Sequence, residues 1–472
     1  MSTELKFTKL NHSSSIESVL LAPSVSRVLP SSVAKNSIFQ NKKSAQTHSA
    51  EDLGIGASRK AKELIKEYLS SLKQKDSAQT ADVLQRIVKH RPSSEAYTQL
   101  GLRYWELNDM GRAAQALEKA VKLDPNNVTA HFHLGTVYLT PFLKSGDTSK
   151  LRKAVKPVRK AIKAGVHSAV AHLYLGIAYT GLKVWQTAEE QFYKSIELDS
   201  HLSAAYMKLA DLYVELGNLT PAKRDDYYRE AIETYRKLIE IDPKNSDAYN
   251  LMGMRYADLG DHKAALEIYE KAVVNGAEDM ITLASLGTAY LEARRFEEAR
   301  TVLRRITETD PRKINAYFNK KELNRLDMNR FLADAYTSYG VACLELFNQQ
   351  QESQKDDEDA ELIQEAESSF KKAIKLDPDH INPHFNLGVL YHQQDRIEEA
   401  ISETKRALEI KPDHRESQEN LQEFEEKLRA RAKAEHPLTK LLSFATDMGV
   451  TDLAARHDYY AHGRREENAD TR

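Results

Sequence analysis

The sequence contains a single cysteine, Cys343, among 472 residues. One thiol cannot form an internal disulfide, which is typical of proteins kept in a reducing compartment, and we interpret Cys343 as a small buried apolar residue. Long hydrophobic runs are also missing. No stretch approaches the roughly 18 apolar residues of a membrane span, and Val19–Ala22 is too short for a secretory signal. We therefore expect a cytoplasmic protein; an organelle transit peptide in the acid-poor residues 1–56 is less favoured, because arginine is scarce there.

The motifs of common catalytic sites are absent as well. There is no Gly-x-Gly-x-x-Gly segment, no phosphate-binding loop and no Gly-x-Ser-x-Gly turn. A lone cysteine excludes a zinc–thiolate site. The formal net charge of −2 gives no global attraction to nucleic acid or anionic lipid. We expect no enzymatic activity, no catalytic, cofactor or metal residues, no nucleic-acid partner and no membrane span.

What the sequence does contain is a small residue that recurs in one setting. It follows Leu, Met or Tyr, and in all but one case a Tyr comes three residues later. Three of the spacings between these small residues are 34 residues, a period typical of stacked helical hairpins. The eight positions are Gly101, Gly135, Gly176, Ala210, Gly253, Gly287, Gly340 and Gly388.

The surroundings of these residues resemble the tetratricopeptide repeat (TPR). The first unit has the aromatic, Leu-Gly, Tyr, small-residue and closing Pro positions of that family at Tyr97, Leu100, Gly101, Tyr104, Ala113, Leu117, Ala120 and Pro125. About eight such units can be read from Ser94 to Pro412. The resemblance implies an all-α fold, a right-handed superhelical solenoid of helical hairpins, which presents a binding surface rather than performing chemistry.

Five regions are predicted along the chain. They are a disordered tail at 1–56, a degenerate capping helical pair at 57–93, eight repeats with insertions at 94–412, a capping helix at 413–435 and a tail at 436–472 with a short amphipathic segment. The longer spacings place insertions around 140–150, 219–228, 312–331 and 348–361. We expect loops or extra helical turns there.

The TPR resemblance also implies that the first helix of each hairpin lines a concave groove. In the first half of the chain the corresponding face is apolar and aromatic, which suits a partner's amphipathic helix or extended hydrophobic segment. The residues that chaperone-binding relatives use to clamp a carboxylate are replaced here. The predicted groove residues are Leu102, Trp105, Phe132, Leu139, Leu173, Tyr174, Ile177, Met207 and Val214. The chain's own tails are an alternative occupant of this face.

Two functional readings remain open. The favoured one is a protein–protein interaction scaffold or adaptor that binds a partner in the groove, in complex assembly or regulation. The alternative is an accessory or regulatory subunit of an enzyme system, in which residues 438–463 contact the effector. A basic stretch from Lys144 to Lys163 is interpreted as a solvated outer face, with a phosphate-bearing or acidic partner as the alternative. The partner's identity and the oligomeric state stay open.

Overall fold

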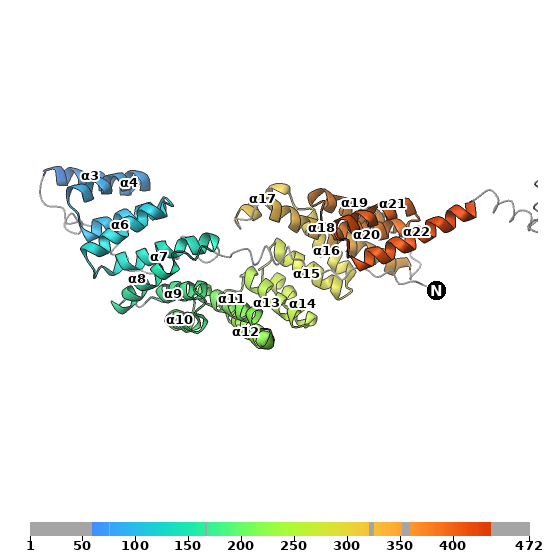
Figure 1. The fold of residues 1–472 in the computed structure, drawn as a ribbon, viewed down its shortest axis with the longest axis horizontal. Coiled ribbons are helices and arrows are strands. Elements are labelled where there is room, and N and C mark those ends of the chain that lie inside the picture. The colour runs from blue at the N-terminus through green and yellow to red at the C-terminus, as the bar shows by residue number, and fades with distance from the viewer. Residues whose placement is uncertain (1–58, 75, 166–167, 321–324, 352–358, 436–472) are drawn as a thin grey trace, which may run out of the picture. The chain divides into compact units, whose positions relative to one another are not determined.

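The computed structural model describes residues 59–74, 76–165, 168–320, 325–351 and 359–435. Over these ranges the regular structure is entirely helical, with twenty α-helices and one short 3-10 helix (Figure 1). The predicted all-α fold class is therefore confirmed. The predicted tails at 1–56 and 436–472 lie outside the described residues.

The chain forms two compact units, whose described parts are residues 59–328 (the N-terminal unit) and 329–435 (the C-terminal unit). Helices of the N-terminal unit alternate between the first and second members of successive hairpins, and α17 follows the last of these pairs. The helices are α3 Arg59–Gln74, α4 Ser77–His90, α5 Ser94–Glu106, α6 Met110–Leu123, α7 Val128–Ser145, α8 Leu151–Lys163, α9 Ala169–Gly181, α10 Trp185–Leu198, α11 Ser203–Leu219, α12 Arg224–Ile241, α13 Ser246–Asp258, α14 His262–Val274, α15 Met280–Glu292, α16 Phe296–Thr307 and α17 Pro311–Lys320.

The long helix α18 begins in the N-terminal unit and continues into the C-terminal unit. In the C-terminal unit, α19 packs on α20, α20 on α21 and α21 on α22. The bounds are α18 Arg325–Gln351, α19 Asp359–Leu376, α20 Ile381–Gln393, α21 Ile397–Ile410 and α22 Arg415–Glu435. Cys343 on α18 is fully buried, as predicted, and its thiol donates a hydrogen bond to Glu365 Oε2 at 3.4 Å.

Side chains at the helix starts explain why the elements begin where they do. Asn127 caps α7 by accepting a hydrogen bond from the backbone N–H of Ala130 at 2.8 Å. Its amide nitrogen also donates to Ser94 Oγ at 2.8 Å. A single residue thus satisfies an orphan donor of α7 and ties that helix to α5 in the preceding hairpin.

The glycines at the eight recurring small-residue positions are called the ladder glycines here. They set how closely the two helices of a hairpin approach. A Cβ atom on Gly176 of α9 would lie 2.5 Å from the ring of Phe192 on α10. On Gly287 of α15 it would lie 2.5 Å from Leu303 Cγ on α16. Real Cβ atoms do not come this near to another carbon, so the missing side chain is what lets these helices cross.

One left-handed residue reverses the chain in each short hairpin. It lies seven positions after the ladder glycine, between the first and second helices. The backbone φ angle there is between 57° and 79°. The five residues are Asn108, Lys183, Gly260, Arg294 and Asp395. Residues in this conformation are common at helix C-termini, where they end the helix.

The predicted insertions take helical as well as loop form. The 140–150 insertion lengthens the first helix of its hairpin, because α7 continues through Pro141 to Ser145. Proline costs one backbone hydrogen bond inside a helix, which buried packing can offset. Residues 221–223 form a 3-10 turn ahead of α12, and α17 occupies much of the 312–331 segment.

Candidate functional site

The apolar face predicted on the first helices follows a fixed spacing from the ladder. Eight of its nine residues lie three before, one after or four after the small residue of their own helix. Positions that follow one another by four and three residues fall on one side of a helix. The face therefore continues along α5, α7, α9 and α11. The neighbouring first helices in this series contact one another.

The structure divides the predicted groove residues by exposure. Leu102 and Trp105 on α5 and Met207 on α11 are half-buried, so part of each side chain is open. The remaining six are buried, each no more than 8% exposed; they are Phe132, Leu139, Leu173, Tyr174, Ile177 and Val214. The expectation of an exposed apolar face is corrected for these six, because they pack in the interior. Among the nine predicted residues, open surface therefore remains on these three, at the two ends of the face.

An aromatic cluster occupies the middle of this face. The rings of Phe132 on α7 and Tyr174 on α9 stack, with centroids 5.7 Å apart and planes inclined by 19°. The ring of His133 meets Phe132 edge-on at 5.4 Å. Offset and edge-on contacts are the arrangements that aromatic quadrupoles favour. The cluster therefore joins two consecutive hairpins through their first helices.

Two polar atoms within the cluster lack hydrogen-bond partners among the described residues. They are Nε2 of His133, a residue that is 8% exposed, and the hydroxyl of Tyr174, a residue that is 1% exposed, and both atoms are buried. Burial lowers the pKa of His133 to about 4, so its ring is neutral at pH 7, and burial raises the pKa of Tyr174. An unpaired buried polar group costs about 1–3 kcal/mol. Neither atom is open to solvent in this conformation, so a bound group can pair with it only when neighbouring side chains move.

Sequence reasoning did not include His133 in the face. Its register was nevertheless readable, because His133 and Tyr174 both lie two residues before their ladder glycine. Helices aligned by that glycine place the two side chains at equivalent positions. The periodicity of the sequence therefore predicts that His133 and Tyr174 occupy equivalent positions. It does not predict that their polar atoms lack hydrogen-bond partners.

Farther along the N-terminal unit, the first helices carry polar groups on this side. Asn250 of α13 is fully buried and donates from Nδ2 to Thr282 Oγ1 of α15 at 3.1 Å. Its Oδ1 has no partner within the described ranges. Direct links between neighbouring first helices thus change from aromatic stacking at α7 and α9 to an amide–hydroxyl pair at α13 and α15.

The histidines that replace tyrosine in the repeat pattern have structural partners. His172 shares a hydrogen bond with Gln191 at 2.9 Å, and His384 with Glu403 at 2.7 Å. His131 Nε2 contacts the carbonyl oxygen of Pro125 at 2.9 Å. No group of three or more His, Cys, Asp or Glu residues suited to a metal ion occurs in the part of the chain that the structure describes.

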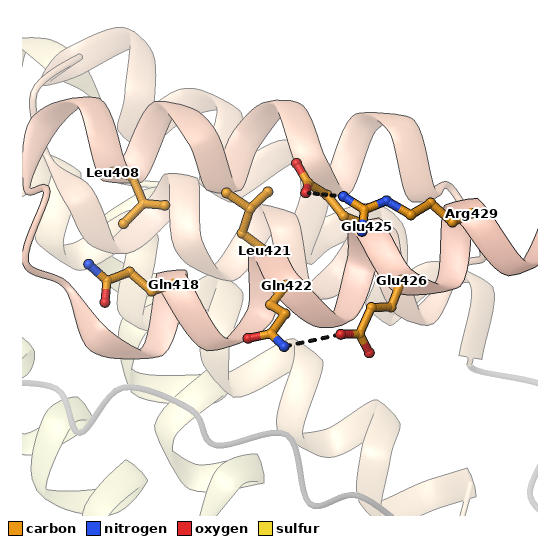
Figure 2. A pocket seen from close by; sticks show the side chains of 7 residues that line it. All are labelled: Leu408, Gln418, Leu421, Gln422, Glu425, Glu426 and Arg429. Atoms are coloured by element: carbon orange, nitrogen blue, oxygen red, sulfur yellow. Dashed lines mark hydrogen bonds and ion pairs between the residues drawn. The ribbon is translucent and has the colours of Figure 1, made fainter.

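A cleft lies in the C-terminal unit, between α21 and α22. This open cleft of about 330 Å³ is lined by Leu408 of α21 and by residues of α22, including Leu421 (Figure 2). Its rim is polar: Glu425 pairs with Arg429 at 3.4 Å, and Gln422 donates to Glu426 at 3.0 Å. Since the rim groups already satisfy one another, the cleft offers two half-buried leucines and little else.

Four models of one repeat family match the sequence. A model described as TPR repeat matches residues 96–140, and models described as tetratricopeptide repeat match residues 203–245, 234–267 and 359–423. These segments cover hairpins in both units. No helix within the described residues is long and apolar enough to cross a bilayer. No curated protein matches the sequence significantly.

Several solved structures resemble the chain. MamA is 28% identical over 39% of this chain and 91% of its own, with a TM-score of 0.33. YrrB, a TPR protein with an unusual peptide-binding site, is 22% identical over 43% of this chain and 97% of its own, with a TM-score of 0.34. A chain of the APC/C hetero-tetramer Cut9–Hcn1 is 13% identical over 78% of this chain and 96% of its own, with a TM-score of 0.36. At such scores the structural likeness adds no argument to the sequence matches.

Proposed function

Since the chain is a tetratricopeptide repeat protein, with repeats across residues 96–423, we propose that it binds a helix or hydrophobic segment of a partner protein on the face of α5, α7, α9 and α11. TPR proteins are generally protein–protein interaction scaffolds, and their fold is typically non-catalytic. In this proposal the protein performs no reaction. It holds a partner during assembly or regulation of a complex.

The observation that carries the proposal is the continuity of apolar residues across four consecutive first helices. In this chain 29% of the residues are charged. The positions three before, one after and four after the small residue of these helices are nevertheless mostly aliphatic or aromatic. A partner segment crossing this face contacts Leu102 and Trp105 at one end and Met207 at the other. These half-buried side chains provide the open apolar area that such segments favour.

The buried aromatic cluster between the two ends of the face can make partner binding specific, through its two unpaired polar atoms. His133 Nε2 and the Tyr174 hydroxyl are both buried in the free protein, so in this proposal neighbouring side chains move aside on binding and let backbone groups of the segment reach them. A tyrosine hydroxyl donates or accepts, and a neutral imidazole nitrogen does either, depending on its tautomer. Pairing these atoms on binding adds affinity, because the unbound protein already bears the cost of leaving them unpaired.

The test substitutes the open ends of the face and leaves its buried middle intact. The double variant Trp105→Glu, Met207→Glu is compared with Leu123→Glu, Leu198→Glu, which makes the same change at exposed leucines ending α6 and α10. Co-purifying proteins are identified by mass spectrometry, and the Kd of the main partner is measured. We expect at least a tenfold weaker Kd in the first variant only. Equal affinity of both variants and the wild type would exclude this face.

Truncation after Glu435 addresses the accessory-subunit alternative in the same assay. If residues 438–463 contact the effector, partner recovery falls on truncation and is unaffected by the two glutamates on α5 and α11. If the face binds the partner, the opposite pattern is expected.

A further inference from the structure

A separate feature of the N-terminal unit is a long stretch of one charge sign. Residues 125–188 carry nine lysines and arginines but one acid, Asp147, in a chain whose formal net charge is −2. That acid is occupied in its loop, where its Oδ1 accepts a hydrogen bond from the N–H of Ser149 at 2.9 Å. The helices α7, α8 and α9 contain no acidic residue.

The cations gather on one side of α8. Arg152, Lys156, Arg159 and Lys163 follow one another by four, three and four residues, and all four are exposed. At about 1.5 Å rise per residue, they form a straight row of roughly 16 Å. The opposite side of α8, with Leu151, Ala154, Val158 and Ala161, is buried against α7 and α9. The row, here called the basic stripe, therefore faces away from the groove helices.

None of the four stripe cations forms an ion pair with any described residue. Some cations of other second helices do form ion pairs: Arg112 pairs with Asp109 at 2.5 Å beside α6, Lys371 with Glu367 on α19 and Arg406 with Glu409 on α21. In a helix, like charges four residues apart repel. An unneutralised row of this kind is a cost to the isolated protein, which an anionic partner removes.

We propose that the basic stripe of α8 docks an acidic segment of a partner protein, on a surface distinct from the apolar groove. In an extended segment, alternate side chains are spaced by about 6.6 Å on one face. The stripe cations are spaced by about 4.5–6 Å along the helix axis, so long, flexible side chains can meet carboxylates at that repeat. The two arginines can each grip a carboxylate through two parallel hydrogen bonds.

The surroundings of α8 favour an acidic polypeptide over other polyanions. The basic surface does not continue onto the next second helix, because α10 bears Glu189, Glu190 and Glu197. Specific DNA interfaces bury about 1,000 Å² or more of protein, which exceeds one face of a 13-residue helix. A membrane surface favours apolar side chains that insert, and α8 exposes none. A narrow acidic segment matches both the length and the width of the stripe.

The test uses the full chain and a labelled peptide in which Glu and Ser alternate, with a Gln-for-Glu peptide as the neutral probe. Binding is measured by fluorescence anisotropy at low and raised salt. The stripe variant is Arg152→Glu, Lys156→Glu, Arg159→Glu, Lys163→Glu. Its control, Lys122→Glu, Lys194→Glu, Lys237→Glu, Lys271→Glu, changes the net charge equally at exposed lysines on four different second helices. Circular dichroism checks that both variants keep their helices.

We expect binding of the acidic peptide by the wild type and the control, at least tenfold weaker binding by the stripe variant, and no binding of the neutral peptide. Raising the salt should weaken binding because the contact is between exposed charges. A Gln substitution at the same four positions should give an intermediate loss. Equal binding by stripe variant and control overturns the proposal. So does absence of acidic-peptide binding, or tenfold tighter binding of duplex DNA or anionic vesicles than of the peptide.

Discussion

Phe132 of α7 and Tyr174 of α9 stack their rings 5.7 Å apart, across the boundary between two hairpins. The hydroxyl at the end of one ring has no partner within the described residues. The aromatic rings therefore stabilise the contact between hairpins, while the buried hydroxyl of Tyr174 contributes no hydrogen bond to it. This division of roles within one side chain leads to the first prediction.

Tyr174→Phe should separate stability from binding. Removing an unpaired buried hydroxyl relieves a cost of about 1–3 kcal/mol and leaves the ring stack in place. We expect the thermal midpoint of the purified protein to stay level or rise, and its affinity for a groove partner to fall. A clear loss of stability would mean that the hydroxyl is satisfied in the free protein.

His133 should make the N-terminal unit sensitive to mild acid. Its pKa is about 4 in the folded protein and about 6.5 when unfolded, so below pH 6.5 the unfolded chain takes up a proton that the folded one does not. Stability is therefore lost as the pH falls from 6.5 to 4, by up to about 3 kcal/mol at the lower end. Thermal melting of wild type and His133→Gln across this range checks it. The variant should show the shallower decline.

Gly176→Ala should destabilise the α9–α10 hairpin. Alanine gains up to about 1 kcal/mol of helix propensity, but its Cβ would lie 2.5 Å from the Phe192 ring, and overpacking a core costs about 1–3 kcal/mol. We expect a net loss of about 1 kcal/mol, localised by hydrogen exchange to α9 and α10. Gly111→Ala near the start of α6 is the matched control. Its nearest neighbour would be 3.6 Å away, so no loss is expected.

Lys183→Gly should stabilise the same hairpin. Lys183 has a φ of 60°, a conformation that costs an L-residue about 1–2 kcal/mol and costs glycine little. After the extra freedom of glycine in the unfolded chain is subtracted, a gain of up to about 1 kcal/mol remains. The reciprocal change, Gly260→Ala at a φ of 79°, should lose a similar amount. Chemical denaturation of both variants measures the pair, and equal shifts in one direction would contradict the explanation.

The fold could be predicted from the sequence because its determinants are local. Each ladder glycine specifies a helix crossing, and closing segments such as Leu123–Pro125 specify where second helices end. The exposure of Tyr174 or Ile177 is not local in this sense. It depends on how closely α9 approaches its neighbours on either side, which the register of one helix does not determine.

The candidate site was therefore only partly readable. The spacing that aligns Trp105, Phe132 and Met207 on one side of their helices could be counted from the glycines. The same count does not show which of these three side chains stay open to solvent. The unpaired state of the α8 cations was hidden for the same reason, because a basic run in sequence does not reveal whether acids from neighbouring helices reach it.

The left-handed residues also mark where the hairpins cannot carry added sequence. In five hairpins a single residue at positive φ reverses the chain, and lengthening the connection there would misalign the two helices that the ladder glycine brings together. The α7–α8 connection is longer: Gly146, also at a positive φ of 71°, ends α7, and residues 145–150 are all exposed. Exposed connections of this kind tolerate insertion best. A foreign epitope or reporter domain grafted between Gly146 and Lys150 would be displayed while the hairpins keep their register.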